Sequence, residues 1–242
     1  MKRAIAWILA VTALLGSGLA FGAAKAVNVT GAVSAQVAAG PARTIHEGDT
    51  VNTKDVVLTG PASSVVLRFD DGEIASLGQN SRMSIDAYDY NAQAKTGNVF
   101  LNLLTGGMRA VTGLIGRNSP QNVSYKAATA TIGIRGTDVT LATDGAETVV
   151  AVLEGLISVR IGNQVVSVPA GDAIFIRRDG RFTEGPLGTI MDLVKGTPLS
   201  RELATLLPQT NPNGGPVPGT SYTPGNNTSP GGGGGGGTAS GS

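Results

Sequence analysis

The sequence predicts an all-β domain, a β-sandwich or β-roll of short strands similar to a double-stranded β-helix, with one or two short C-terminal helices. Short segments such as 64–69 and 82–90 alternate apolar and polar residues, which is typical of strands with one buried face. Turn pairs such as Asp71-Gly72 and Asp144-Gly145 separate these segments,. A spacing of three to four between apolar residues begins only after Pro186, and it indicates helices.

The expected elements follow the chain in short steps. The strands are expected at 27–37, 56–58, 64–69, 73–77, 82–90, 99–104, 107–114, from 123 onwards, 127–141, 148–153, 156–161, 165–168 and 173–178,. Two short amphipathic helices are expected at 186–195 and 199–207,. They either form an arm that docks a partner or cover an open end or edge of the β-structure, and we expect the covering role.

The strand at 127–141 is interrupted in its middle by Gly133-Ile134-Arg135-Gly136-Thr137. Two glycines three positions apart inside a strand pattern indicate a bulge, a bend or a close backbone approach. Arg135 stands between them in an apolar and hydroxylated run. The residue either clamps the bend from inside or is displayed towards a carboxylate of a partner.

We expect the internal clamp for Arg135, because glycine-flanked carbonyls can approach closely enough to satisfy a buried guanidinium. Its expected partners are turn carbonyls or an acid such as Asp138, Asp172 or Glu154.

Both ends of the chain differ in composition from its middle. Residues 1–26 have the layout of a secretory signal peptide, with Lys2 and Arg3 before an apolar run,. Ala24-Lys25-Ala26 is the expected cleavage site and Ala20-Phe21-Gly22 is the second candidate; an uncleaved anchor is the alternative. Residues 208–242 are rich in Pro and Gly, and we expect them to be a disordered tail,. The β-domain is therefore expected at 27–185, with a helical segment at 186–207 packing on it.

The charge balance does not favour nucleic acid or an anionic membrane surface. Removing Lys2, Arg3 and Lys25 from the 18 basic residues leaves 15 against 17 acidic residues. A near-neutral chain offers no strong electrostatic footprint for either partner. The sequence contains no cysteine, so lipid attachment of the bacterial lipoprotein type is excluded and no disulfide is expected.

Residue types that build catalytic and metal sites are scarce. His46 is the only histidine, beside Glu47, so neither a zinc site nor a Ser-His-Asp arrangement is expected. Paired acids such as Asp70 with Asp71, or Asp86 with Asp89, could serve glycoside cleavage,. Turn chemistry explains Asp70-Asp71-Gly72 better. We expect no enzymatic activity, no cofactor and no metal.

Several motifs occur in a fixed order and resemble the FecR domain of bacterial envelope proteins, from about residue 31 to residue 176. The motifs are Glu47-Gly48-Asp49-Thr50-Val51, Val65-Val66-Leu67-Arg68-Phe69-Asp70-Asp71-Gly72, Gly106-Gly107-Met108-Arg109, Ala130-Thr131-Ile132-Gly133-Ile134-Arg135-Gly136-Thr137-Asp138, Leu153-Glu154-Gly155 and Ala170-Gly171-Asp172. The Arg-Gly-Thr core is the most specific of them. Residues 152–176 also resemble half a cupin, although the metal-binding histidines of cupins are missing.

The resemblance implies an all-β domain outside the cytoplasmic membrane with no known catalysis. It assigns a structural, family-motif role to Gly48, Asp49, Asp71, Gly72, Gly133, Arg135, Gly136, Thr137, Asp138, Gly155, Gly171 and Asp172. Signalling members carry a cytoplasmic anti-sigma segment and a membrane span before this domain. Here only 26 residues precede the expected β-domain, so their signalling role is not carried over.

We therefore expect an exported, non-enzymatic binding or scaffold module in the periplasm or outside the cell. Its expected partner is an envelope protein or glycan, with no nucleic acid and no stable membrane insertion after signal cleavage. The alternatives are a periplasmic sensor or regulator in trans-envelope signalling of the iron-transport type, and an enzyme that acts on envelope polysaccharide through paired aspartates.

Overall fold

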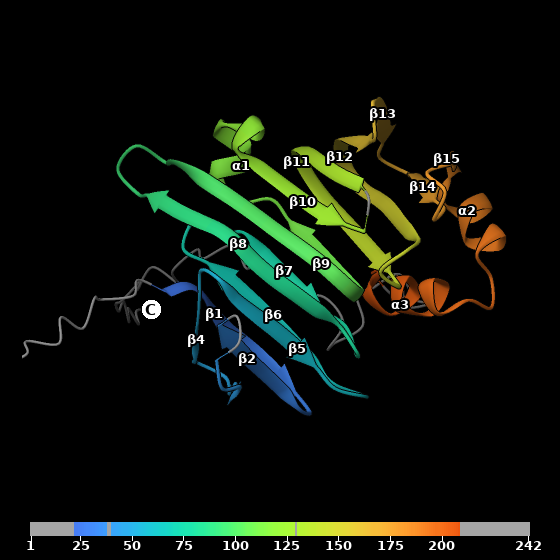
Figure 1. Cartoon of the computed structure of the whole chain (residues 1–242). Helices are drawn as coiled ribbons and strands as arrows, with labels where there is room; N and C mark the ends of the chain where they lie inside the picture. The colour runs from blue at the N-terminus through green and yellow to red at the C-terminus, as the bar shows by residue number, and fades with distance from the viewer. Residues whose placement is uncertain (1–21, 38–39, 129, 209–242) are drawn as a thin grey trace, which may run out of the picture. The chain divides into compact units, whose positions relative to one another are not determined.

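Fifteen strands join into one hydrogen-bonded sheet, so the all-β prediction is confirmed (Figure 1). The structure is a computed structural model that describes residues 22–37, 40–128 and 130–208. The apolar run of the expected signal and nearly all of the expected tail lie outside these residues. All described strands and helices belong to one unit that ends at Leu207.

The first half of the domain contains nine strands. They are β1 (Gly22–Thr30), β2 (Val33–Val37), β3 (Arg43–Thr44), β4 (Thr50–Asn52), β5 (Asp55–Thr59), β6 (Ser64–Phe69), β7 (Ile74–Leu77), β8 (Arg82–Asn91) and β9 (Thr96–Val111). Two short helical turns follow, α1 (Leu114–Asn118) and the 3₁₀ helix η1 (Pro120–Asn122).

The second half contains six strands and two helices. They are β10 (Val123–Ala127), β11 (Ala130–Thr143), β12 (Thr148–Ile161), β13 (Gln164–Pro169), β14 (Asp172–Ile176), β15 (Phe182–Pro186), α2 (Leu187–Leu193) and α3 (Pro198–Leu206). The two expected C-terminal helices are thus confirmed.

Strand β9 joins the two halves of the sheet. The first part of this 16-residue strand pairs with β8 on one edge and, in parallel, with β10 on the other. Its last part pairs with β7 and β11. Gly106 lies between these two parts with a φ of +88°, a conformation that suits glycine. The strand therefore changes partners in its middle, and the sheet curls around it.

One hydrophobic cluster runs through the interior from Ala23 in β1 to Ile176 in β14. The alternation predicted from the sequence produces it, because every second side chain of β5, of β6 and of β11 as far as Ile134 is buried,. Burial of this apolar surface is the main term that stabilises the fold.

The structure joins or divides several expected segments. Segments 99–104 and 107–114 largely merge into β9, and segments 148–153 and 156–161 form the single strand β12. Gly31, with a φ of +71°, ends β1 and divides the first expected strand in two. The sequence analysis missed β15, which pairs with β14, and it missed the short helix α1.

Helices α2 and α3 cover part of the outer face of the sheet. A second cluster places Ile190, Val194, Leu199 and Leu203 of the helical segment against Ala142, Val149, Ala151, Ala173 and Phe175 of the sheet. Small residues beneath the helices permit this close approach. None of the described helices is long and apolar enough to cross a membrane.

The first described strand, β1, begins at Gly22, five residues before the domain boundary expected at 27. In β1, the side chains of Ala23, Ala24 and Ala26 are buried in the core. Cleavage after Ala26 would remove every residue of β1 that pairs with β4, and three of the six that pair with β6. The second candidate site, after Gly22, retains all three of these alanines.

We predict that the mature exported protein begins at Ala23. Mass spectrometry of the N-terminal peptide from the exported fraction tests this start. A chain that begins at Val27 should unfold at a clearly lower temperature than one that begins at Ala23, because it lacks buried residues and strand pairs. A mature N-terminus at Val27 with equal thermal stability of the two chains would contradict the prediction.

Candidate functional site

The interruption in β11 is a bulge that faces a second bulge in β12. Gly136 and Gly155 have φ values of +59° and +82°. A Cβ atom on Gly155 would lie 2.2 Å from the carbonyl oxygen of Gly136 and 3.0 Å from that of Arg135. Only glycine fits this approach, so two motif glycines that are distant in sequence form one structural feature.

The paired bulges keep the register of the two strands but change which face each residue occupies. Arg135 pairs with Leu156, and Val139 pairs with Val152, so four positions separate the pairs on each strand. Ile134 and Val139 are both buried although they are five positions apart, which regular alternation forbids. Each strand has therefore gained one residue at the bulge.

Thr137 fixes the bulge to the end of β9. Its backbone N–H donates to Thr112 Oγ1 at 2.9 Å, and the N–H of Thr112 donates to the Thr137 carbonyl at 2.9 Å. The two hydroxyl oxygens lie 3.1 Å apart. Both residues are buried, so these bonds satisfy polar groups that water cannot reach.

The arginine that clamps this region is Arg109, not Arg135. Arg109 on β9 donates to both carboxylate oxygens of Asp138, from Nε at 2.9 Å and from Nη2 at 2.6 Å. Both side chains are only 14% exposed. Asp138 pairs with Val111 in the β9–β11 register, which places it diagonally beside Arg109 on the same face.

The internal-clamp prediction for Arg135 is wrong. Its side chain is exposed, and within the described residues no hydrogen bond or ion pair reaches it. The physical reason is its place before the bulge, where odd-numbered residues of β11 point away from the core. Neither Asp172 nor Glu154, the other expected partners, contacts it.

The Asp71-Gly72 turn joins β6 to β7 and also organises α1. The carboxylate of Asp71 is 2% exposed and accepts from the N–H of Glu73 at 3.1 Å and of Ile115 at 3.2 Å. A Cβ on Gly113 would lie 2.3 Å from Asp71 Oδ2. Burial raises the pKa of Asp71, partly opposed by these hydrogen bonds,.

Glu73 is a fully enclosed acid that the sequence analysis did not single out. The hydroxyl of Tyr125 donates to its Oε1 at 3.2 Å, and its Oε2 has no described partner. Burial first, and then the nearby Asp71, raises the pKa of Glu73 well above its ordinary value,. Burial also raises the pKa of Tyr125. Since both side chains are 0% exposed, the pair lies inside the core rather than at an open site.

The remaining motif residues stabilise turns. The N–H of Gly48 donates to Ala26 at 2.7 Å, and Asp49 accepts from the N–H of His46 at 2.8 Å. The N–H of Gly171 donates to the Val152 carbonyl at 2.9 Å. Asp172 begins β14 and pairs with Pro186 of β15. The interactions of this set are with the domain's own backbone.

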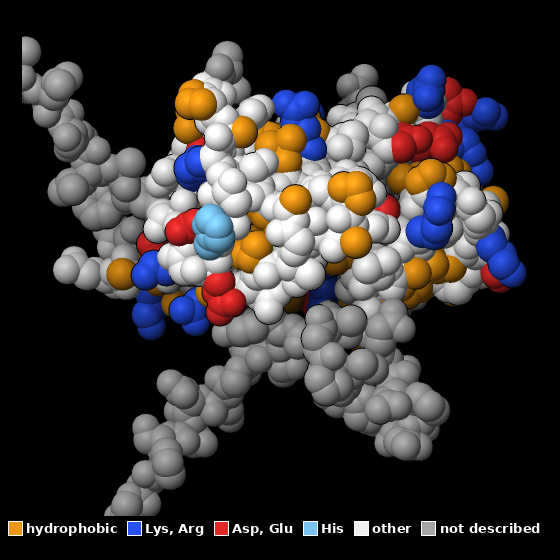
Figure 2. All heavy atoms as spheres, turned by 90° about the horizontal axis from the view of Figure 1, so that it is seen from below, with side chains coloured by type: hydrophobic (Ala, Val, Ile, Leu, Met, Phe, Trp, Pro, Cys, Tyr) orange, Lys and Arg blue, Asp and Glu red, His pale blue; other side chains and the backbone are white. Residues whose placement is uncertain are grey.

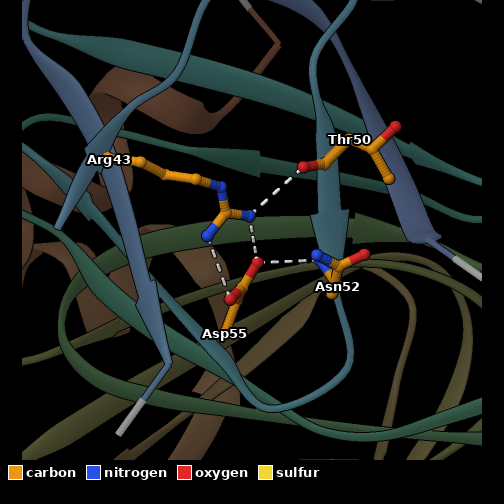
Figure 3. Close-up of polar contacts among 4 residues, drawn as sticks. All are labelled: Arg43, Thr50, Asn52 and Asp55. Carbon is orange, nitrogen blue, oxygen red and sulfur yellow. Dashed lines mark hydrogen bonds and ion pairs between the residues drawn. The ribbon is translucent and has the colours of Figure 1, made fainter. Parts of the chain in front are cut away.

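A second ion pair holds β3, β4 and β5 together (Figure 3). The guanidinium of Arg43 contacts both carboxylate oxygens of Asp55 and donates to the Thr50 carbonyl at 3.2 Å. The N–H of Asn52 donates to Asp55 Oδ2 at 2.8 Å. Asp55 is fully buried, so its carboxylate depends on these hydrogen bonds and on the ion pair to offset its loss of contact with water. The role of the arrangement is therefore structural.

The surface seen from below Figure 1 mixes charges of both signs. Figure 2 shows basic and acidic side chains interspersed there, with the single histidine at the surface. His46 is 77% exposed and lies 3.5 Å from Asp49. This mixture agrees with the low net charge of the sequence and provides no extended basic surface on that side.

The outer face of β10–β13 remains open, whereas helices cover the neighbouring part of the sheet. Ser124, Gly133, Ser158 and Ser167 follow one another across these four strands in a single cross-strand row. Because Gly133 has no side chain and the serines are small, the face is hollowed along this row. We call the depression the Gly133 hollow.

The Gly133 hollow has a volume of about 400 Å³. Its lining residues are Pro120, Gln121, Val123, Ser124, Thr131, Gly133, Ile134, Arg135, Leu156, Ile157, Ser158, Arg160, Val165 and Ser167. Two of these are arginines and none is an acid. Arg160, like Arg135, is exposed and has no ion-pair or hydrogen-bond partner among the described residues.

The sequence analysis did not find Arg160 or the hollow. The signal was present as the alternation of Leu156, Ser158 and Arg160, which places these three side chains on one face of β12,. The missing information was that Gly133 lies opposite Ser158, because cross-strand register cannot be read from alternation alone.

Among the described residues, no three His, Asp, Glu or Cys side chains come together as a metal site. The members of each pair of acids named in the sequence analysis also have different surroundings. Asp71 is enclosed and bonded to backbone N–H groups, whereas Asp70 is exposed. Asp86 accepts from Ser84, and Asp89 accepts from Asn98.

The region that contains both bulges and most of the residues lining the Gly133 hollow matches a family model, whereas Arg160, Val165 and Ser167 lie beyond the match. The model is that of the FecR protein family, over residues 55–158. Residues 55–158 are therefore similar to the FecR protein family. The matched segment runs from β5 almost to the end of β12, and the resemblance seen in the sequence motifs is confirmed.

The chain also shows similarity to solved structures. Two structures of a candidate anti-sigma factor from Parabacteroides distasonis match at 12% identity, with TM-scores of 0.44 and 0.45. The matches cover 58% of this chain, and 65% and 64% of the two solved chains. The comparison with curated proteins finds no match.

We predict different effects on stability for the two arginines of the FecR motifs. Replacing Arg109 by Ala leaves Asp138 as an uncompensated, mostly buried charge and should lower the free energy of unfolding by about 3 kcal/mol. Replacing the exposed Arg135 by Ala should change it by about 0.5 kcal/mol or less. Urea unfolding at pH 7 measures both free energies. A decrease of about 3 kcal/mol on replacing Arg135 would instead support the internal-clamp role of that residue.

We predict that stability falls as pH rises above about 4.5, the ordinary pKa of glutamate. Glu73 has a raised pKa in the folded state, so the unfolded chain loses its proton first. The contribution of Glu73 to the free energy of unfolding is therefore fully present below the pKa that Glu73 has in the unfolded chain. It is lost as pH rises through the higher pKa that Glu73 has in the folded protein.

Unfolding of wild type and Glu73→Gln between pH 4 and 8 tests this dependence. In Glu73→Gln, the free energy of unfolding should decrease much less as pH rises. The smaller decrease that remains comes from Asp71, whose pKa is also raised. Tyr125→Phe serves as the control, because it removes the hydrogen bond but retains the acid, and its decline should persist. Parallel pH profiles for wild type and Glu73→Gln would contradict the assignment.

Proposed function

We propose that this chain is an exported, non-enzymatic FecR-domain protein that binds a protein or glycan in the bacterial envelope or outside the cell. The family match supports a regulatory or signalling module. The signal-like segment before Ala23 supports export,.

The Gly133 hollow is the observation that carries the proposal. Its two arginines have no ion-pair or hydrogen-bond partner among the described residues and no acid lines the depression beside them, whereas the neighbouring Arg109 and Asp138 are bonded to one another. Exposed guanidinium groups beside a depression are typical of recognition surfaces. Glu73 and Asp71 are enclosed and are not available to a substrate. The charged groups that an external molecule can reach therefore suit binding.

The test compares capture of envelope components by three forms of the exported protein. The wild type is compared with an Arg135→Glu, Arg160→Glu double variant and with an Arg178→Glu, Lys195→Glu control. All four side chains are exposed, so both double variants change the net charge equally. Cross-linking in the envelope followed by mass spectrometry should recover one defined species with wild type and control, and lose it with the hollow variant. Equal recovery from all three would reject the hollow as the binding surface.

A regulator in trans-envelope signalling is the second candidate, favoured by the FecR match alone. It requires a membrane-anchored N-terminus, whereas the exported module requires cleavage. The N-terminal mapping described above separates the two. Recovery of the protein in the membrane fraction with Met1 retained would favour the regulator over the exported module.

A further inference from the structure

We propose that the Gly133 hollow binds an extended peptide segment with two acidic side chains four positions apart. This inference rests on the proposed binding function and specifies the ligand. It is drawn from the floor of the hollow, the placement of its charges and the nature of its rim.

The floor of the hollow is shallow and polar. In the row through Gly133, the side chains are those of Ser124, Ser158 and Ser167. Their hydroxyls both donate and accept hydrogen bonds, and the missing Cβ of Gly133 lets another backbone come close to the sheet. A small residue in the middle of a bound segment therefore fits above this row.

The positive charges lie at opposite ends of the floor. Arg160 lies in the row of Thr131, and Arg135 lies in the row of Leu156. The two rows are four residues apart, which is about 13 Å along a strand. An extended segment repeats at the same rise, so acids at positions i and i+4 match both arginines while the residue at i+2 lies over Gly133.

The surrounding charges strengthen this match. Lys126 faces the same side as Thr131 and Arg160, because it pairs with Thr131 across β10 and β11, and it is exposed. No aspartate or glutamate lines the hollow. The nearby Asp138 is bound to Arg109, so it does not neutralise Arg135.

The rim favours peptide over sugar. Leu156 and Val165 are 38% and 55% exposed, and they provide apolar contact for side chains. The lining contains no aromatic ring, which a glycan site would normally use for stacking. The volume of about 400 Å³ lies within the range of ligand pockets, about 300–1,000 Å³.

Synthetic peptides test the charge spacing with the full-length exported protein. The probe is a capped seven-residue peptide with glutamates at positions two and six, separated by serine and threonine. Matched peptides carry glutamines at the same positions, or adjacent glutamates. Fluorescence anisotropy should show binding of the first peptide that weakens about tenfold when NaCl rises from 50 to 300 mM, because exposed charges are screened. The other two peptides should bind at least tenfold more weakly.

Two protein variants test the site. Arg160→Glu should weaken binding of the probe about tenfold or more, and the Arg178→Glu, Lys195→Glu control should not. A Gly133→Val, Ser158→Ala variant should fill the hollow without a clash, because Ser158 Oγ is the near obstacle to a Cβ at Gly133, at 2.8 Å. Valine favours strands, so this variant should keep its melting temperature and lose binding.

Each contrary outcome overturns a defined part of the inference. Equal affinity for adjacent glutamates would reject the four-residue spacing. Arginine-dependent binding of polygalacturonate without binding of the peptide would reject peptide in favour of an acidic glycan. Failure of all probes, while envelope capture still depends on Arg135 and Arg160, would reject the acidic ligand and leave the proposed function standing. Unchanged affinity in the filled variant would place the peptide elsewhere.

Discussion

The contact between the backbones of Gly136 and Gly155 is the constraint on which the rest of the domain depends. At 2.2 Å from a carbonyl oxygen, no side chain can stand at Gly155, and both strands must take up one extra residue there. The consequence extends along β11 and β12, because every side chain beyond the bulge changes face relative to regular alternation. Thr112 and Thr137 hold the bend, and Arg109 with Asp138 closes it on the outer side.

The bend also divides the outer surface into two regions with different roles. Beyond it, Ala142, Ala151 and Ala173 present a smooth surface on which α2 and α3 pack. Before it, Gly133 and its row of serines leave a depression between two arginines without partners. A single pair of strands therefore builds a helix-covered surface at one end and an open hollow at the other.

The ionisable side chains of the domain differ in burial and in pairing. Glu73 and Tyr125 are enclosed in the core, where burial raises the pKa of the Glu73 carboxyl and so couples stability to pH,. The Arg43–Asp55 pair ties the N-terminal strands together (Figure 3). Arg135 and Arg160 remain in contact with solvent at the Gly133 hollow, without a partner among the described residues.

The sequence alone determined the all-β class, the two C-terminal helices, most turns and the resemblance to the FecR family. Each of these follows from local information: alternation, glycine with aspartate at turns, and motif order. Tertiary structure decided the rest, since cross-strand register sets which distant residues meet. In the folded domain Asp138 forms its ion pair with Arg109 rather than with Arg135. The first strand begins at Gly22, and Gly133 lies opposite Ser158. Pairing across strands depends on the total packing of the sheet, and no single segment encodes it.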